Sequence, residues 1–312
     1  MSPTLSAKWY YLLSLFILLV AGEGFPDVTV AQVKRSTTTP ATETDLSSLS
    51  DEFEDPATRN QWLRIYQTEK TNADQLEEFD IAKTRPGWMV MLPYASTWYM
   101  DYRGVLVYKQ VKGDFVVTSN IRVSKRGGDG APRSSYSLAG LMIRTPRDVT
   151  PQTWKPGGEN YIFLSLGSAK RPGTYQFEVK TTLNSRSNLI VTDAGTPAAL
   201  IQIARIGNEF ILLKKTPAGD WNIHQRYRRA DMPHELQVGL TVYTDYSTAS
   251  RMRPAQHNTQ VIKQGRPDLV AGFDYVRFKK PHVPARLTGK SLTNPREVPD
   301  AELLQFLGSK AH

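Results

Sequence analysis

Short runs of alternating apolar and polar residues recur through the middle of the chain, separated by Gly, Pro, Asn and Asp. Successive side chains of a strand point to opposite faces, so each run predicts a strand with one buried face. About a dozen such strands are expected, at 88–92, 104–109, 114–123, 137–144, 161–166, 174–181, 188–192, 199–206, 209–214, 221–227, 235–244 and 271–278. Long helical periodicity is missing here, and the spacing favours an all-β sandwich or barrel.

The last thirty residues have a different pattern. Residues 282–298 are polar and contain Pro, and a short helix is expected near 299–307, because Pro299 begins it, acids occupy its first turn and Gly308 follows it. The helix either docks on the sandwich through its leucines or belongs to a frayed tail.

The first residues resemble an export signal. Lys8 precedes an apolar run at 9–22 that is short for a membrane span of about 30 Å. We expect a signal peptide over 1–31, cleaved after Ala31, with cleavage after Gly22 and an uncleaved anchor as alternatives. Residues 32–48 are rich in Ser and Thr and are expected to form a disordered linker. The mature chain would be secreted or periplasmic, without a stable membrane span.

The amino-acid composition excludes several kinds of site and partner. The 312 residues include no Cys, which excludes disulfides, thiol nucleophiles and Cys-ligated zinc. A net charge of +9 could attract an anionic polymer or surface. The basic residues are dispersed rather than gathered in a block, so no nucleic-acid partner is expected.

The order of several short motifs from Asp51 to Lys280 resembles concanavalin A-like jelly rolls of the lectin and glucanase type. The motifs are Asp51-Glu52-Phe53-Glu54 with Trp62, Gly113-Asp114-Phe115, Ala139–Arg144, Ile203–Phe210 with Gly219-Asp220-Trp221, Val238-Gly239-Leu240 and Phe273–Arg277. The chain is most similar to the family called domain of unknown function 1349. The resemblance implies a jelly-roll β-sandwich of two antiparallel sheets over 49–281, followed by a tail at 282–312.

Family 16 glycoside hydrolases, which the two ends of this region also resemble, carry the motif E-x-D-x-x-E on a central strand. Two carboxylates that flank one glycosidic bond perform that chemistry. The nearest string here, Glu78 to Lys83, ends in Lys and lies too early in the domain, and Glu178 stands alone. The E-x-D-x-x-E motif is therefore absent. Its absence favours a non-catalytic protein but does not exclude an enzyme.

Aromatic residues are the main binding candidates. Tyr94, Trp98 and Tyr99 fall in one short stretch, and rings of this kind stack on the C–H faces of sugars. Polar and aromatic neighbours expected on the same concave face are Asp101, Arg144, Trp154, Glu159 and Asn160. Trp98, Tyr99 and Trp154 could equally belong to the core, since sandwiches pack with the same residue types.

The resemblance also implies a structural Ca²⁺, because many sandwiches of this type hold one ion between an acid near the first strand and an Asp on the last. Glu52 and Asp274 occupy the matching positions. Carboxylate and carbonyl oxygens suit Ca²⁺. The alternative is that both acids only cap turns or pair with Arg.

The sequence therefore favours an exported, non-catalytic jelly roll that binds a glycan of the envelope or the extracellular space. Two alternatives remain: a glycan-active hydrolase or lyase, and a structural or protein-interaction module of the envelope. Fold alone does not separate them.

Overall fold

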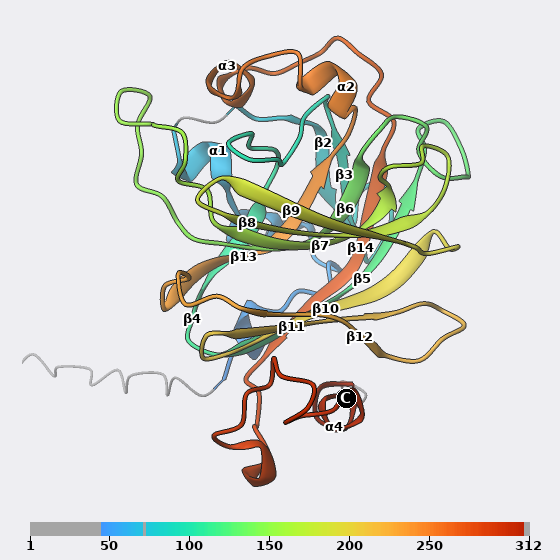
Figure 1. The fold of residues 1–312 in the computed structure, drawn as a ribbon. Coiled ribbons are helices and arrows are strands. Elements are labelled where there is room, and N and C mark those ends of the chain that lie inside the picture. The colour runs from blue at the N-terminus through green and yellow to red at the C-terminus, as the bar shows by residue number, and fades with distance from the viewer. Residues whose placement is uncertain (1–44, 71–72, 309–312) are drawn as a thin grey trace, which may run out of the picture. The chain divides into compact units, whose positions relative to one another are not determined.

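The computed structural model describes residues 45–70 and 73–308, and these form a sandwich of two seven-stranded sheets, visible as two layers in Figure 1. All strand pairs are antiparallel. The strands are β1 (Leu63–Arg64), β2 (Leu76–Ile81), β3 (Met89–Pro93), β4 (Val107–Lys112), β5 (Phe115–Ser124), β6 (Ser137–Arg144), β7 (Tyr161–Ser168), β8 (Gln176–Leu183), β9 (Arg186–Asp193), β10 (Ala198–Ile206), β11 (Glu209–Lys215), β12 (Asn222–Arg228), β13 (Glu235–Tyr243) and β14 (Val270–Lys279).

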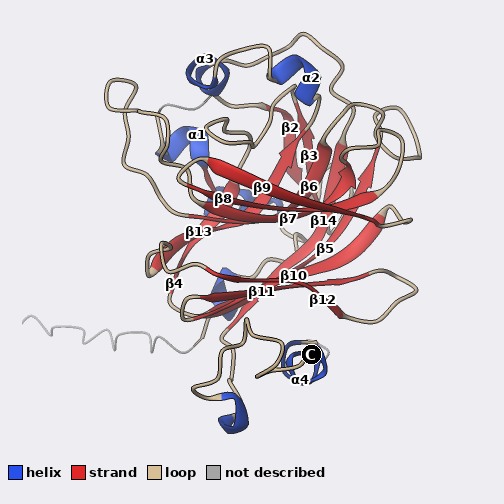
Figure 2. Cartoon of the chain, viewed as in Figure 1, coloured by secondary structure: helices blue, strands red, loops and turns tan. Residues whose placement is uncertain are grey.

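Helices are short and lie at the margins of the sandwich, as Figure 2 shows. They are α1 (Ile65–Thr68), α2 (Tyr246–Ala249), α3 (Pro254–Thr259), α4 (Asp300–Leu307) and three 3₁₀ turns at Ser47–Leu49, Pro56–Gln61 and Ala285–Leu287. Among the described residues, none of these helices combines the length and apolar character needed to cross a bilayer. The all-β prediction and the predicted short C-terminal helix are confirmed.

Sheet 1 has the strand order β12-β11-β10-β5-β14-β3-β2, and sheet 2 has the order β1-β4-β13-β6-β7-β8-β9. Each of the dozen expected strands overlaps an observed one. The two additional strands are β1, with only two residues, and β2, whose interior carries Glu77 and Glu78 and therefore lacks a simple apolar alternation.

The main core lies between the two sheets and follows the alternation of each strand. On β6, Ala139, Leu141 and Ile143 pack into this core. Leu138 and Met142, at the alternate positions, belong to a second apolar cluster on the outer face of sheet 2. That outer face is therefore covered rather than open to solvent.

The beginning and the end of the sandwich are joined on sheet 1. Asp51 pairs with Val276 of β14 through two backbone hydrogen bonds of 2.8 and 2.9 Å. The Asp51 side chain also accepts a hydrogen bond of 2.9 Å from Trp62 Nε1. Leu46, inside the expected linker, already packs against the core. The expected signal peptide lies outside the described residues, as do residues 32–44 of that linker.

The tail docks on sheet 1, which resolves the alternative left open by the sequence. Leu303 and Leu307 of α4 are buried against apolar residues of β10 and β11. Glu209 on β11 holds the preceding segment by accepting hydrogen bonds of 2.8 Å from Ser291 Oγ, the Leu292 backbone N–H and Thr293 Oγ1.

Candidate functional site

Two connecting segments cover the outer face of sheet 2. Residues 94–106 lie between β3 and β4, and residues 244–262 follow β13. They contact each other through isolated bridges between Ala95 and Ile262 and between Ser96 and Thr244. Neither segment shows the alternation of apolar and polar residues that is typical of a strand. The sequence alone therefore does not predict that they form a second layer.

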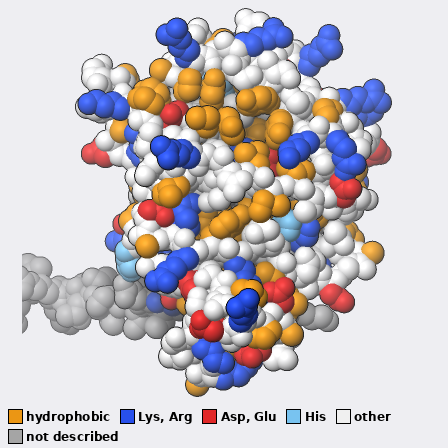
Figure 3. Space-filling view, in the orientation of Figure 1, with side chains coloured by type: hydrophobic (Ala, Val, Ile, Leu, Met, Phe, Trp, Pro, Cys, Tyr) orange, Lys and Arg blue, Asp and Glu red, His pale blue; other side chains and the backbone are white. Residues whose placement is uncertain are grey.

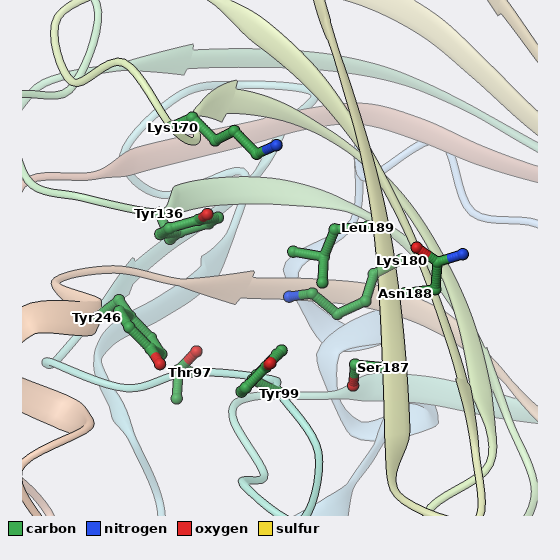
Figure 4. Close-up of a pocket in the computed structure, with 9 residues that line it drawn as sticks. All are labelled: Thr97, Tyr99, Tyr136, Lys170, Lys180, Ser187, Asn188, Leu189 and Tyr246. Atoms are coloured by element: carbon green, nitrogen blue, oxygen red, sulfur yellow. The ribbon is translucent and has the colours of Figure 1, made fainter.

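A pocket of about 360 Å³ opens between this layer and strands β8 and β9; we call it the tyrosine pocket. Its size falls in the range of small-molecule sites. Figure 4 shows the nine residues that line it: Thr97, Tyr99, Tyr136, Lys170, Lys180, Ser187, Asn188, Leu189 and Tyr246.

Three tyrosine rings form a connected aromatic wall. The ring centroids of Tyr99 and Tyr246 are 6.2 Å apart with planes at 87°, and those of Tyr136 and Tyr246 are 5.5 Å apart at 63°. These are edge-to-face contacts, a favourable geometry for aromatic pairs. All three side chains are only partly buried, so faces of the rings remain available to a ligand.

Lys180 forms the floor of the tyrosine pocket. On β8, Phe177 and Val179 point into the main core, and alternation places Glu178 and Lys180 on the other face. Lys180 Nζ donates hydrogen bonds to the Trp98 carbonyl oxygen at 2.5 Å and to the Tyr243 hydroxyl at 2.7 Å.

Lys180 Nζ also lies 3.0 Å from Glu178 Oε1, an ion pair that is almost fully buried. Tyr243 donates to the same Glu178 oxygen, at 3.0 Å. Burial lowers the pKa of Lys180, and the Glu178 carboxylate opposes this effect. Since an ammonium group has three donors, protein groups already engage all of them.

Behind this layer lies a second buried cluster, which we call the ion network. It contains Glu69, Arg103, Arg144, Arg147 and Glu159. Arg144 is fully buried and donates to both acids: Nη1 to Glu69 at 2.5 Å and Nε to Glu159 at 2.8 Å. The network joins the residue after α1 and the segment before β4 to β6 and the loop that follows β6.

Each carboxylate of the ion network is paired with at least two arginines. Burial by itself would raise the pKa of Glu159, but Arg144, Arg103 and Arg147 outweigh it and hold that pKa at about 2. Glu159 is therefore ionised throughout the physiological range and cannot act as a proton donor. We interpret the network as structural.

Three of the predicted binding residues are fully buried, so their assignment to an open groove is corrected. Trp98 is fully buried, donates from Nε1 to the Val105 carbonyl at 2.9 Å and packs edge-on against Tyr161. Arg144 and Glu159 are also fully buried, and their charged groups pair with each other in the ion network. The sequence could not separate these roles, because core and binding site use the same residue types.

Of the other predicted residues, only Tyr99 lines the tyrosine pocket. Asp101 accepts hydrogen bonds from Gly157 N at 2.8 Å and Ser185 Oγ at 2.5 Å, and Asn160 accepts one from Asn184 N. Trp154 lines a separate, smaller cavity of about 70 Å³. Tyr94 is half-buried and also lies outside the lining.

Seven further lining residues, together with Thr97 inside the aromatic stretch, were missed by sequence reasoning. Tyr136 precedes β6 and Tyr246 begins α2, and both are far from that stretch in sequence. Lys180 could have been predicted from the strand pattern. Glu178 and Lys180 are two positions apart on β8, and the residues that alternate with them are apolar, so both charged side chains point to the same face.

The two acids expected to bind Ca²⁺ have protein partners. Arg277 forms a two-pronged ion pair with Glu52, with hydrogen bonds of 2.8 and 2.9 Å. Asp274 accepts a hydrogen bond of 3.0 Å from Asn120 Nδ2. Among the described residues, no group of three or more His, Cys, Asp or Glu side chains converges as a metal site would require. The Ca²⁺ site stays a prediction.

No protein-family model matches the chain, and no curated protein matches its sequence. The resemblance to domain of unknown function 1349 therefore also stays a prediction. Solved structures, in contrast, share the fold.

A protein of unknown function from Saccharomyces cerevisiae is similar with a TM-score of 0.50 at 11% identity, over 72% of this chain and 99% of that one. A xylan β-1,4-xylosidase from Bacillus halodurans is similar at 0.47 and 15% identity over 74% of this chain, which spans only 39% of that enzyme. Basic winged bean lectin is similar at 0.40 and 12% identity, over 66% of this chain and 92% of the lectin. The sandwich of two antiparallel sheets is thus a fold that this chain shares with the yeast protein.

Proposed function

We propose that this protein is a non-catalytic glycan-binding jelly roll and that the tyrosine pocket is its binding site. The observation that carries the proposal is the wall of Tyr99, Tyr136 and Tyr246 around a cavity of about 360 Å³. Sugar rings present C–H faces that stack on aromatic rings, and their hydroxyls need polar partners. Thr97, Asn188 and the tyrosine hydroxyls supply such partners.

The arrangement favours binding over hydrolysis. A glycosidase of the common type needs two carboxylates about 5–9 Å apart on either side of the bond. None of the nine residues that line the tyrosine pocket is an acid. Glu178 lies behind Lys180, which is itself engaged by three protein groups. Glu178 is the one carboxylate described beneath the pocket floor, and it is already paired with Lys180. This arrangement favours glycan binding over cleavage of a glycosidic bond.

The test is a glycan-array screen with the full chain, followed by titration of the best ligand against single variants. Tyr246→Ala removes the ring that contacts both other tyrosines and is expected to weaken binding roughly tenfold or more. Tyr66→Ala is the matched control, because Tyr66 is also partly buried but lies on α1 outside the pocket.

Equal affinities for Tyr246→Ala and Tyr66→Ala would contradict the assignment of the pocket. Incubation of the bound glycan with the protein, followed by mass spectrometry, separates binding from catalysis. Shortened or unsaturated products that are absent with heat-denatured protein would show a glycan-active enzyme instead.

Two further parts of the proposal concern the whole chain. We infer export to the periplasm or the extracellular space from the apolar run at 9–22; an exported protein whose mass still includes residues 1–31 would contradict cleavage after Ala31. The Ca²⁺ proposal requires Glu52 to exchange its Arg277 partner for the ion. A melting temperature that does not change between chelator and added Ca²⁺ would refute it.

A further inference from the structure

A second cavity, of about 450 Å³, lies beside the connecting segments and has a different chemistry; we call it the arginine cavity. It is lined by Arg133, Ser134, Asp245, Ser247, Thr248, Arg251, Gly265 and Arg266. Three arginines and three hydroxyl residues around one hollow form a set of hydrogen-bond donors suited to an oxyanion.

The three guanidinium groups are available to a ligand. Arg133, Arg251 and Arg266 are exposed, and none of the ion pairs formed among residues 45–70 and 73–308 includes them. Elsewhere on the molecule arginines are frequently paired, as Arg277 is with Glu52. Three exposed like charges around one cavity create a positive local potential that attracts an anion.

The one acid of the arginine cavity does not neutralise it. Asp245 is buried and engaged by the backbone: Oδ2 accepts a hydrogen bond from Arg266 N at 2.6 Å, and Oδ1 accepts one from Thr248 N at 3.3 Å. Nearby Asp268 accepts backbone N–H groups of Arg126 and Arg133. Both carboxylates organise loops, and the lining keeps an excess of positive charge.

The same two chain segments contribute residues to the arginine cavity and to the tyrosine pocket. Arg133 and Ser134 line the first, and Tyr136 of the same segment lines the second. Tyr246 lines the tyrosine pocket, whereas its chain neighbours Asp245 and Ser247 line the arginine cavity.

The two segments are held together where the cavities meet. Tyr246 N donates to the Ser135 carbonyl at 3.1 Å, and the hydroxyl oxygens of Ser135 and Ser247 are 2.9 Å apart. Neighbouring residues of the same two segments therefore line the two cavities. In Figure 3, Lys and Arg side chains surround hydrophobic ones on the upper part of the face shown.

We propose that the ligand is an acidic polysaccharide: one sugar unit binds in the tyrosine pocket, and an anionic substituent of an adjacent unit binds the guanidinium groups of the arginine cavity. This inference rests on the proposed function and adds the charge class of the ligand. Carboxylates of uronic acids and sulfate esters share the required chemistry, because arginine binds planar and tetrahedral oxyanions through paired N–H donors. Lys170, exposed at the rim of the tyrosine pocket, adds to the positive charge.

A duplex nucleic acid fits the geometry less well. Its binding usually needs a basic strip that follows the phosphate backbone. Here the unpaired arginines gather at one cavity, and the adjacent aromatic rings line a pocket instead of a flat, exposed stacking surface.

The experiment measures binding of the full chain to polygalacturonate, dextran sulfate, neutral dextran and duplex DNA. The cavity variant carries Arg133→Ala, Arg251→Ala and Arg266→Ala. The control variant carries Arg228→Ala, Lys279→Ala and Arg296→Ala, three exposed positions that line neither cavity and remove the same net charge. Single substitution of Arg251 is the fallback if the triple variant melts early.

At least one acidic polymer is expected to bind the wild type at least tenfold more tightly than neutral dextran, with an affinity that falls as salt rises. The cavity variant should lose at least tenfold of that affinity, and the control variant less than twofold. Preference between polygalacturonate and dextran sulfate identifies the anionic group.

If both triple variants lost the same amount of affinity for the acidic polymer, the effect would come from net charge alone, and the proposal would be overturned. So would stronger binding of DNA through the same arginines, or failure of both acidic polymers to bind the wild type. Failure of the proposed function is distinguishable, because it appears as Tyr246→Ala having no effect on any glycan, acidic or neutral.

Discussion

The backbone N–H of Thr97 donates a hydrogen bond of 3.2 Å to Nε2 of His257. His257 is fully buried on α3, and its other ring nitrogen lies 3.0 Å from Asn258 Oδ1. Because Nε2 accepts, the ring is neutral, with its proton on Nδ1. This contact holds the segment that carries Tyr99 against α3, and protonation of Nε2 would remove the acceptor of the hydrogen bond.

The first prediction concerns acid stability. Burial lowers the pKa of His257 to about 4, and burial together with Lys214 lowers the pKa of His224 to about 4. Between pH 6.5 and 4 the unfolded chain binds protons that the folded chain does not, so the free energy of unfolding falls as pH falls. We expect a loss of a few kcal/mol across this window in denaturant titrations. A flat profile would contradict it.

The matched variant is His257→Gln, which keeps a side-chain acceptor for Thr97 but cannot take up a proton at these pH values. Its free energy of unfolding should decline less steeply between pH 6.5 and 4 than that of the wild type. A slope identical to that of the wild type would show that His257 does not titrate as its burial implies.

The second prediction separates core from site. Trp98→Ala removes a fully buried ring and is expected to lower the free energy of unfolding by about 3–5 kcal/mol. Tyr99→Ala removes a partly exposed ring, and its main effect should be on glycan affinity. Thermal melts paired with binding titrations distinguish the two. A Trp98→Ala protein of normal stability with impaired binding would reverse our correction.

The third prediction tests the ion network. Glu159→Gln leaves Arg103, Arg144 and Arg147 with one carboxylate fewer and should cost about 3–5 kcal/mol of stability. The depressed pKa of Glu159, about 2 against 4.5 for a free side chain, adds stability that is complete above pH 4.5. That stability is lost toward pH 2, and the loss should be smaller in Glu159→Gln. Urea unfolding at pH 7 and pH 3 measures both effects.

The fourth prediction addresses the pocket floor by a double-mutant cycle. Lys180→Met alone leaves Glu178 buried without its ammonium partner and should destabilise the fold by about 3–5 kcal/mol. Lys180→Met combined with Glu178→Gln removes both charges and should recover much of that loss. Additive effects of the two substitutions would mean that the pair is not coupled.

The fold was largely predictable because the alternation of each long strand records which face is buried. Ser137–Arg144 illustrates this: alternate residues pack into the main core, and the expected bounds agree with β6. The failures have a physical cause. β2 carries adjacent acids at its centre, and the covered outer face of sheet 2 makes both faces of several strands apolar.

The candidate site was much less predictable. Its walls come from four separate parts of the chain, brought together by contacts such as the hydrogen bond from Tyr246 N to the Ser135 carbonyl. Nothing local marks Tyr136 or Tyr246 as different from other tyrosines. Trp98 became a candidate because aromatic residues cluster around it in the sequence. Its ring is fully buried and belongs to the core, which the sequence alone does not show.

The docking of α4 provides a way to orient the molecule on a surface. The helix packs on the outer side of sheet 1, near β10 and β11, whereas the tyrosine pocket belongs to sheet 2, as Figure 1 lets the reader follow. Gln305 is exposed on α4, and the chain has no cysteine of its own. A cysteine introduced at position 305 would be the sole thiol, so coupling through it would tether every molecule by the same side and leave the pocket facing the solution.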